Sequence, residues 1–435
     1  MKRFWLVLLS LGLVMAFSAS VFAVDVKFSG EFYVGGMWLD KTTFKKDTAT
    51  DGPSTAFFYQ RLRLTTEFVA APGVKLITRA DIMEKAWGTT RTAPGTTLDS
   101  LSQGTTAENE NIAFDMAYVE FATAAGLIKA GYQGDGAWGT VFGDSFSSAP
   151  CITWIVPMGA FTPLAKYCKA TESSYTAKNL TQTAADRDND TILAAFIYAW
   201  KGGNAGLLGK YYHMSSARAT FGDATQWYLL IPYLKAKLGP VALQSEVYYA
   251  WGKYPTATGE KDLNNLTAWV DATATFGPVY FGGTVAYVSG DDQTTTDKME
   301  GGILSGGADW NPCLLLWNYD RNYWVGGIAG QGTATNAGYM SNAWFFQGKV
   351  GVKPTAKFDI MGSVAYAFAD KKPIGYVSDA YGWEIDVTGT YKITNNLSYM
   401  LGVGYLMTGD YFKGATTGTA IKDNYIVVNK LTLTF

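Results

Sequence analysis

The sequence lacks the side chains on which most enzyme and cofactor sites depend. Of 435 residues, one is histidine (His213) and three are cysteine. A single histidine excludes bis-histidine haem ligation and multi-histidine zinc sites, and it leaves little room for a Ser/His/Asp arrangement. The formal net charge is −2, so no basic surface is available for a nucleic acid. We therefore expect no enzymatic activity, no metal, no cofactor and no nucleic-acid partner.

Charge and long apolar runs are also scarce. Charged residues make up 17% of the chain, whereas soluble proteins usually carry about 25%. After the first two dozen residues, the longest apolar stretch is residues 192–200, too short for a transmembrane helix and suited to one membrane-crossing strand. Aromatic residues reach 15%, which excludes a disordered chain. The composition is that of a folded protein that is neither a helical membrane protein nor an ordinary soluble one.

The N-terminus has the pattern of a signal peptide. Lys2 and Arg3 precede a short apolar run, residues 5–17, and residues 18–23 end in Val-Phe-Ala. This pattern predicts a signal peptide over residues 1–23, with cleavage after Ala23. The alternative is an N-terminal anchor helix, for which the apolar run is short. The mature chain, residues 24–435, would leave the cytosol.

The mature chain alternates between apolar and polar residues with a period of two. Trp383, Ile385 and Val387 define one face of a predicted strand, and Glu384 and Asp386 define the other. The last strand shows the same alternation up to the C-terminus. Such contrast between faces is typical of strands that have lipid or a core on one side and water on the other.

Short turns and long connectors follow one another along the chain. Seven tight turns are expected at residues 72–73, 124–126, 202–206, 239–240, 277–278, 354–355 and 395–396. Eight long connectors lie at about 40–55, 88–111, 134–189, 218–225, 253–264, 291–341, 370–381 and 413–422. Together they predict an all-β, antiparallel up-and-down transmembrane β-barrel of about 16 strands, with short periplasmic turns and long extracellular loops. The alternative is a soluble β-sandwich with an aromatic core.

Local motifs resemble those of Gram-negative general porins. Residues 117–121 (AYVEF) and 126–133 (GLIKAGYQ) resemble the strand–turn–strand that precedes the third porin loop, and the chain ends in Phe435. Tyr132 stands where the porin pattern usually has arginine, and Leu433 where tyrosine is common. The resemblance implies a homotrimer in the outer membrane of a Gram-negative bacterium. It also implies that Phe435 is recognised by the barrel-insertion machinery, and that residues 134–189 fold into the lumen as a constriction loop.

Two cysteines fall within the expected constriction loop. Cys151 and Cys168 can close a small ring that would stiffen it, which leaves Cys313 unpaired. The alternative is that all three thiols are free and buried.

Charged side chains at the narrowest section set the selectivity of a wide pore. Strand parity turns Arg61, Arg63 and Glu67 toward the lumen, and Arg79 and Asp81 join them from the next strand. The porin resemblance implies acids on the third loop opposite this basic wall, and the candidates are Asp135 and Asp144. Further lumen candidates are Lys27, Glu31, Gln244 and Glu246. The alternative is that all of these are ordinary solvated lumen residues that lie above or below the constriction.

The sequence therefore favours an outer-membrane porin, a passive diffusion channel for ions and small hydrophilic solutes. Its partners would be outer-membrane lipid, two further copies of the chain and the barrel-insertion machinery. One alternative is a substrate-specific channel, and another is the barrel component of an extracellular electron-transfer conduit. An outer-membrane hydrolase would need His213 beside a suitable partner, and none stands out.

Overall fold

The computed structural model describes residues 25–44, 52–88, 112–143, 147–173, 187–257, 259–302, 310–326, 340–416 and 419–435. The predicted signal peptide, residues 1–23, and the predicted constriction residue Asp144 lie outside the described residues.

The described chain consists almost entirely of β-strands. They are β1 (Asp25–Leu39), β2 (Thr55–Ala71), β3 (Val74–Ala86), β4 (Ile112–Thr123), β5 (Gly126–Gly134), β6 (Ser148–Ile155), β7 (Phe161–Thr171), β8 (Asn189–Trp200), β9 (Gly203–Met214), β10 (Thr225–Leu238), β11 (Val241–Thr256), β12 (Gly259–Phe276), β13 (Val279–Val288), β14 (Lys298–Met299), β15 (Ala343–Thr355), β16 (Phe358–Phe368), β17 (Ala380–Lys392), β18 (Leu397–Thr408) and β19 (Asn424–Thr434). Short helices lie in the connections: η1 (Ser215–Ala217), α2 (Arg218–Phe221), α3 (Tyr319–Val325) and η2 (Asp410–Lys413). No helix among these is long and apolar enough to cross a membrane.

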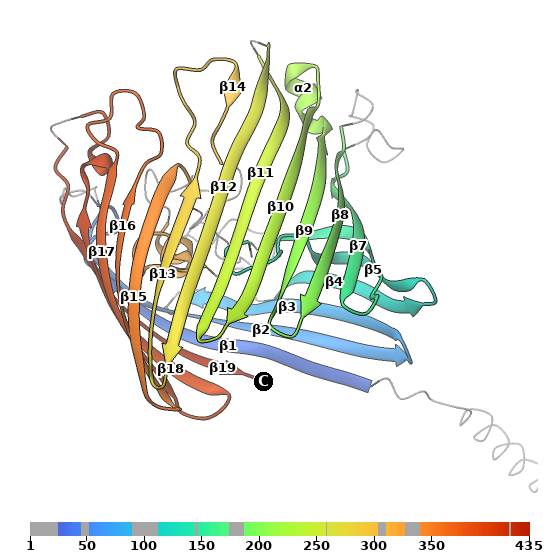
Figure 1. The fold of residues 1–435 in the computed structure, drawn as a ribbon, viewed down its shortest axis with the longest axis horizontal. Helices are drawn as coiled ribbons and strands as arrows, with labels where there is room; N and C mark the ends of the chain where they lie inside the picture. The colour runs from blue at the N-terminus through green and yellow to red at the C-terminus, as the bar shows by residue number, and fades with distance from the viewer. Residues whose placement is uncertain are drawn as a thin grey trace, which may run out of the picture.

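The strands form one closed antiparallel barrel (Figure 1). Each wall strand pairs with its neighbours in the chain, and β1 closes the wall by pairing with both β2 and β19. β14 has two residues, pairs in parallel with β12 and is not part of the wall, which leaves 18 wall strands among the 19 strands of the described residues. The sequence prediction of about 16 strands is therefore wrong by two.

The two additional strands come from the expected constriction loop. Within residues 134–189, β6 and β7 form a hairpin in the barrel wall, so the single long loop of the prediction does not exist. The porin resemblance led to the error, because it implied one inward-folded loop over residues 134–189, whereas Trp154 of β6 and Phe161 of β7 belong to the wall. Both are exposed on the outer face, where a barrel meets lipid. The expected connector at 253–264 is also wrong, because β11 and β12 extend to Thr256 and Gly259.

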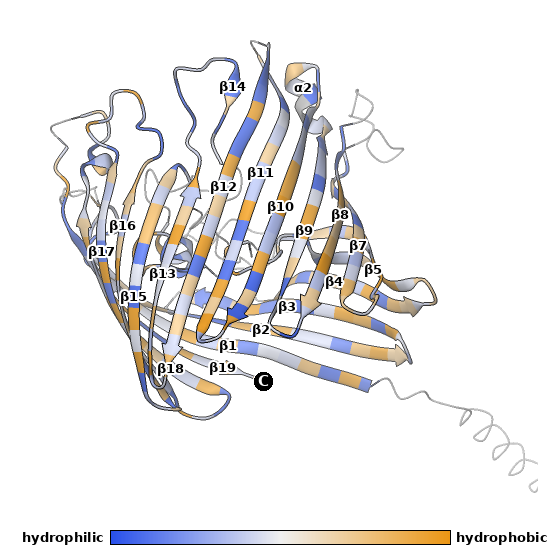
Figure 2. Cartoon of the chain, in the orientation of Figure 1, coloured by the Kyte–Doolittle hydropathy of each residue, from blue (hydrophilic) through white to orange (hydrophobic). Residues whose placement is uncertain are grey.

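The alternation read from the sequence is the alternation of the two barrel faces. On β17, Trp383, Ile385 and Val387 are exposed on the outside, whereas Glu384 and Asp386 are buried on the inside. Figure 2 shows the same exchange of hydrophobic and hydrophilic residues along the other strands. The apolar outer surface satisfies the requirement for a wall in contact with lipid. All seven predicted tight turns lie at or beside strand junctions on one end of the barrel.

Cys151 and Cys168 form a disulfide between β6 and β7. The two residues face each other directly in the antiparallel register, and both are buried. The bond therefore joins two wall strands rather than the two ends of a loop. Cys313 is a free, buried thiol.

This pairing makes a simple prediction about the purified protein. Unfolded without reductant, each chain should show one reactive thiol, Cys313, out of three cysteines. A thiol titration in denaturant, before and after reduction, measures this directly. Three reactive thiols before reduction would contradict the disulfide.

Candidate functional site

The predicted basic cluster is present on the inner wall, but its acidic partners lie on the same wall. Arg63 makes a bidentate pair with Asp81, with Nε–Oδ1 and Nη2–Oδ2 distances of 2.7 Å each. Arg79 pairs with Asp115 on β4, with Nε 3.0 Å from Oδ1. Since bidentate pairing fixes the orientation of a guanidinium, both arginines are held in place by acids of the neighbouring strands.

Arg61 completes this network from the same face of β2. Its guanidinium lies 3.5 Å from Glu31 on β1 and 3.6 Å from Glu84 on β3. The wall formed by the inward charged residues of β1–β4, called here the charged wall, is thus almost neutral. The transverse field implied by the porin resemblance, with arginines on one side and loop acids on the other, is not the arrangement of the described residues.

The remaining lumen candidates occupy separate places. Glu67 lies between Lys27, at 3.3 Å, and Lys75, at 3.2 Å, near the end of the charged wall that carries the short turns. Gln244 on β11 is opposite Lys235 of β10 and Asp271 of β12 in the strand register. Phe435 forms backbone hydrogen bonds with Gly30 of β1, so the C-terminal residue takes part in barrel closure.

Glu246 anchors a segment that folds into the barrel. Residues 135–143, which follow β5 and are called the first inward segment, cross to the inner face of β10–β12. The Glu246 carboxylate accepts hydrogen bonds from Thr140 N at 2.7 Å, Thr140 Oγ1 at 2.5 Å and Tyr248 Oη at 2.6 Å. The indole of Trp138 donates to the carbonyl of Ile231, at 3.1 Å. The first part of the predicted constriction loop therefore does enter the lumen.

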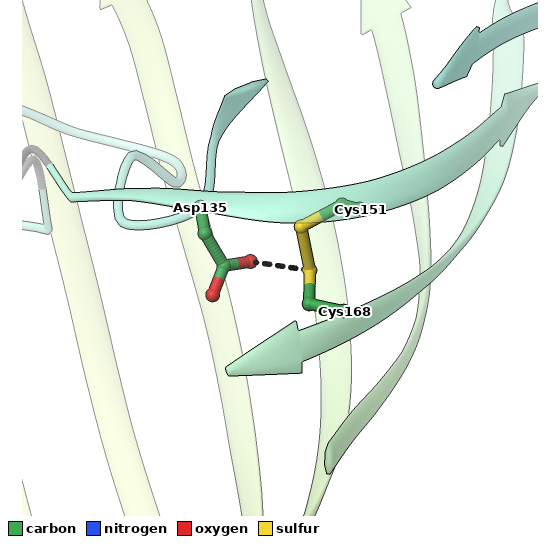
Figure 3. Close-up of side chains that lie close together, drawn as sticks. All are labelled: Asp135, Cys151 and Cys168. Atoms are coloured by element: carbon green, nitrogen blue, oxygen red, sulfur yellow. Dashed lines mark hydrogen bonds between the residues drawn. A yellow bond between two sulfur atoms is a disulfide. The ribbon is translucent and has the colours of Figure 1, made fainter. Parts of the chain in front are cut away.

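Asp135, at the start of the first inward segment, bridges two lysines of the nearby wall strands β7 and β9. Its Oδ2 accepts from Lys210 of β9 at 2.8 Å, and its Oδ1 lies 3.0 Å from Lys166 of β7. Figure 3 shows the same carboxylate beside the disulfide, with Oδ1 3.4 Å from Cys168 Sγ. Asp135 is thus paired with two lysines that are not among the residues predicted from the sequence, and not with the arginines.

The electrostatics of Asp135 favour its charged form. Burial alone would raise the pKa of this carboxyl, but the attraction of Lys210 and Lys166 outweighs burial and lowers the pKa below its ordinary value. The carboxylate is therefore ionised at neutral pH and balances part of the lysine charge.

A cavity of about 410 Å³ lies beside Asp135, between the first inward segment and β5–β11. Its charged lining consists of Lys129, Lys166 and Lys210 against the single acid Asp135. The rest of the lining is largely apolar or aromatic and includes Trp138, Tyr212, Tyr248, Leu164, Leu193, Leu208, Leu229 and Ile231. A small molecule with an anionic group and an apolar body matches this lining.

A second segment enters the barrel from the connection between β14 and β15. Residues 310–326, called the second inward segment, are fixed by Glu384 of β17. The carboxylate accepts three consecutive backbone N–H groups, from Leu314 at 3.0 Å, Leu315 at 2.6 Å and Leu316 at 2.8 Å. Each of these buried N–H groups would cost about 1–3 kcal/mol if it were left without an acceptor. This one carboxylate therefore satisfies the polar backbone of a buried turn.

Helix α3 continues the second inward segment toward the charged wall. Asn318 caps the helix by accepting from the N–H of Arg321, at 2.9 Å, and the Arg321 guanidinium donates to the carbonyls of Gly326 and Thr42. Asp320 accepts from Lys430 of β19 at 2.8 Å and from Tyr59 of β2 at 3.2 Å. The segment is thus attached to β2, β17 and β19.

The two inward segments meet inside the barrel. Phe142 of the first lies edge-to-face with Trp310 of the second, with ring centroids 5.0 Å apart, and stacks on Trp269 of β12 at 5.5 Å. The inner faces of β15–β17 are covered, and Phe345 and Ala365 are at most 1% exposed. In contrast, Arg63 of the charged wall keeps a quarter of its side chain exposed. The segments therefore fill one side of the lumen and leave part of the charged wall, at Arg63 and Glu67, accessible.

The anchoring function of Glu384 predicts the behaviour of Cys313. Burial and the neighbouring carboxylates Glu384 and Asp386 raise the pKa of the Cys313 thiol, so in the folded protein it is neutral and shielded. Glu384→Ala removes the acceptor of three N–H groups, and we expect maleimide to label Cys313 at least about tenfold faster, which corresponds to about 1.4 kcal/mol.

Asp271→Asn is the matched control. Asp271 is also an inner-wall carboxylate, bound to Lys349 at 2.6 Å, and none of its described partners belongs to the second inward segment. Its labelling rate should equal that of the unmodified protein. Equal rates for Glu384→Ala and Asp271→Asn would show that Glu384 does not hold the segment.

Comparisons with known proteins show the fold. No protein-family model and no curated relative matches the chain. Among solved structures, the outer membrane protein OpdK from Pseudomonas aeruginosa, also known with vanillate, aligns over 94% of this chain and 99% of its own at 12% identity, with a TM-score of 0.52. P. aeruginosa OccK2 (OpdF) in complex with glucuronate covers 94% and 97% at 12% identity, with a TM-score of 0.51. A BenF-like porin from Pseudomonas fluorescens Pf-5 covers 94% and 99% at 12% identity, with a TM-score of 0.53. The chain has the barrel fold of these proteins, in agreement with the outer-membrane location expected from the sequence.

Proposed function

We propose that the protein is an outer-membrane channel for a restricted set of small hydrophilic solutes, and that it prefers small organic anions. Transport is passive and driven by the solute gradient. The proposal keeps the homotrimer and the absence of catalysis that were expected from the sequence. It replaces the general diffusion pore by the alternative of a substrate-specific channel.

The lysine-lined cavity is the observation that carries the proposal. Three lysines, one acid and a largely apolar remainder surround about 410 Å³, the size of a small-molecule site. Lys129 has its own partner, Glu120, at 3.1 Å, so the cation excess is concentrated at Lys166 and Lys210. An anion gains from this excess, whereas a cation of the same shape is repelled.

The two inward segments support a narrow route rather than a wide one. Anchored at Glu246 and Glu384, they contact each other through Phe142 and Trp310. A solute must then pass along the charged wall and the cavity, where side chains can distinguish one solute from another.

The solved neighbours offer independent support. Vanillate, bound by OpdK, and glucuronate, bound by OccK2, are both carboxylates of small organic molecules. At 12% identity the likeness does not transfer a substrate, but it favours an anionic class for a barrel of this fold.

The proposal predicts a charge order among solutes of one shape. In liposomes containing the protein, uptake of benzoate should exceed that of benzamide, and uptake of benzamide should exceed that of protonated benzylamine. Lys166→Met should slow benzoate uptake about tenfold, because the variant loses one charge-assisted hydrogen bond to the solute. The rate of benzamide uptake should not change. Lys210 still neutralises Asp135 in this variant.

Lys353→Met is the control for net charge. Lys353 lies at the end of β15, is largely exposed and is not part of the cavity lining. It should leave both rates unchanged. Equal uptake of the three solutes would contradict an anion-selective channel and would support a general diffusion pore instead.

A further inference from the structure

The carboxylate of Asp135 lies between two lysines that line the cavity. One oxygen faces Lys210 at 2.8 Å and the other faces Lys166 at 3.0 Å. Both lysine side chains are largely buried, with 7% and 11% of their surface exposed, and both line the cavity. Two ammonium groups that converge on one carboxylate are the arrangement expected of a carboxylate-binding site.

Asp135 is held in this position by its surroundings. Its backbone N–H donates to Ser147 O at 2.8 Å, at the base of the first inward segment. Lys166 also donates to the carbonyl of Gly134 at 2.6 Å, which ties the lysine to the backbone next to Asp135. The buried disulfide lies against the same carboxylate, as Figure 3 shows, and joins the strands that carry Cys151 and Cys168. The carboxylate is therefore a fixed part of the wall.

We propose that Asp135 is a built-in counter-anion that competes with the transported anion for Lys166 and Lys210, and so weakens binding enough for the solute to leave. The proposal rests on the function proposed above and assigns this residue as the one that sets the affinity of the cavity.

The physics of conduction gives the reason for such a residue. A channel must bind its solute strongly enough to admit it and weakly enough to release it. Two buried ammonium groups without a counter-charge would hold a carboxylate strongly, because electrostatic attraction increases as water is excluded. The other cation of the lining, Lys129, is paired with Glu120. Asp135 therefore decides whether the cavity retains an anion or releases it.

A purely structural function for Asp135 makes the opposite prediction. If the carboxylate served only to hold β7, β9 and the inward segment together, its neutralisation would loosen the cavity and weaken binding. If it is a competitor, neutralisation vacates the position between the lysines and strengthens binding.

Asp135→Asn tests this difference, with Asp271→Asn as the control for loss of one lysine-paired carboxylate elsewhere on the inner wall. Calorimetric titration of the detergent-solubilised barrel with benzoate should give a Kd at least about tenfold lower for Asp135→Asn than for the unmodified protein. The Kd for benzamide should not change. In liposomes, half-saturation for benzoate should occur at a lower concentration, and the maximal rate of uptake should fall because release is slower.

Asp135→Glu keeps the charge and should bind benzoate as the unmodified protein does, and Asp135→Ser provides a second neutral variant if Asp135→Asn does not fold. Unchanged or weaker benzoate binding by a folded neutral variant overturns the proposal. The binding measurement does not depend on transport. Tighter binding in a barrel that does not conduct would support the proposed role of Asp135 and refute the channel function. Conduction without tighter binding would support the channel function and refute the role of Asp135.

Discussion

Every backbone N–H and C=O group of a wall in contact with lipid has to find its hydrogen-bond partner within the protein. In lipid no water is available to unpaired N–H and C=O groups, so a sheet can cross a membrane only as a closed barrel. The pairing of β1 with β19 provides this closure and brings Phe435 to Gly30. The same constraint continues inside. Segments that fold into the barrel carry their own backbone groups, and carboxylates on the inner wall, Glu246 and Glu384, accept hydrogen bonds from those groups.

Inner-wall acids therefore have two different functions in this barrel. Some hold polypeptide: Glu384 binds three backbone N–H groups and Glu246 binds Thr140. Others neutralise cations of the wall, as Asp81 and Asp115 do for the arginines of β2 and β3. Asp135 belongs to the second group by contact, but it stands at a cavity where the cations exceed the anions. Selectivity then arises where neutralisation is incomplete, and not where charge is most abundant.

Local patterns explain why much of the fold could be predicted from the sequence. Alternation with a period of two identified the faces of β17, and turn residues marked seven of the hairpins. The hairpin of β6 and β7 was not predicted, because the resemblance to porins assigned both strands to a single constriction loop. Strand parity correctly turned Arg61 and Arg63 inward. The partner of Asp135 could not be predicted, since Lys210 is 75 residues away and only the closed barrel brings the two together. Strand parity places Glu384 on the polar face of its strand. Nothing in the neighbouring sequence, however, indicates that it binds the second inward segment.

The two inward segments cover the inner faces of β10–β12 and β15–β17 and leave part of the charged wall, at Arg63 and Glu67, open to solutes. Cysteine accessibility in the folded barrel tests this most directly, in a Cys313→Ala background that retains the disulfide. Glu67→Cys places a thiol on the charged wall, where the side chain is 26% exposed, and Ala365→Cys places one on β16, where exposure is 1%. We expect rapid reaction of Glu67→Cys with a charged methanethiosulfonate reagent and protection of Ala365→Cys. Equal reaction at both positions would show that the inward segments do not cover β16.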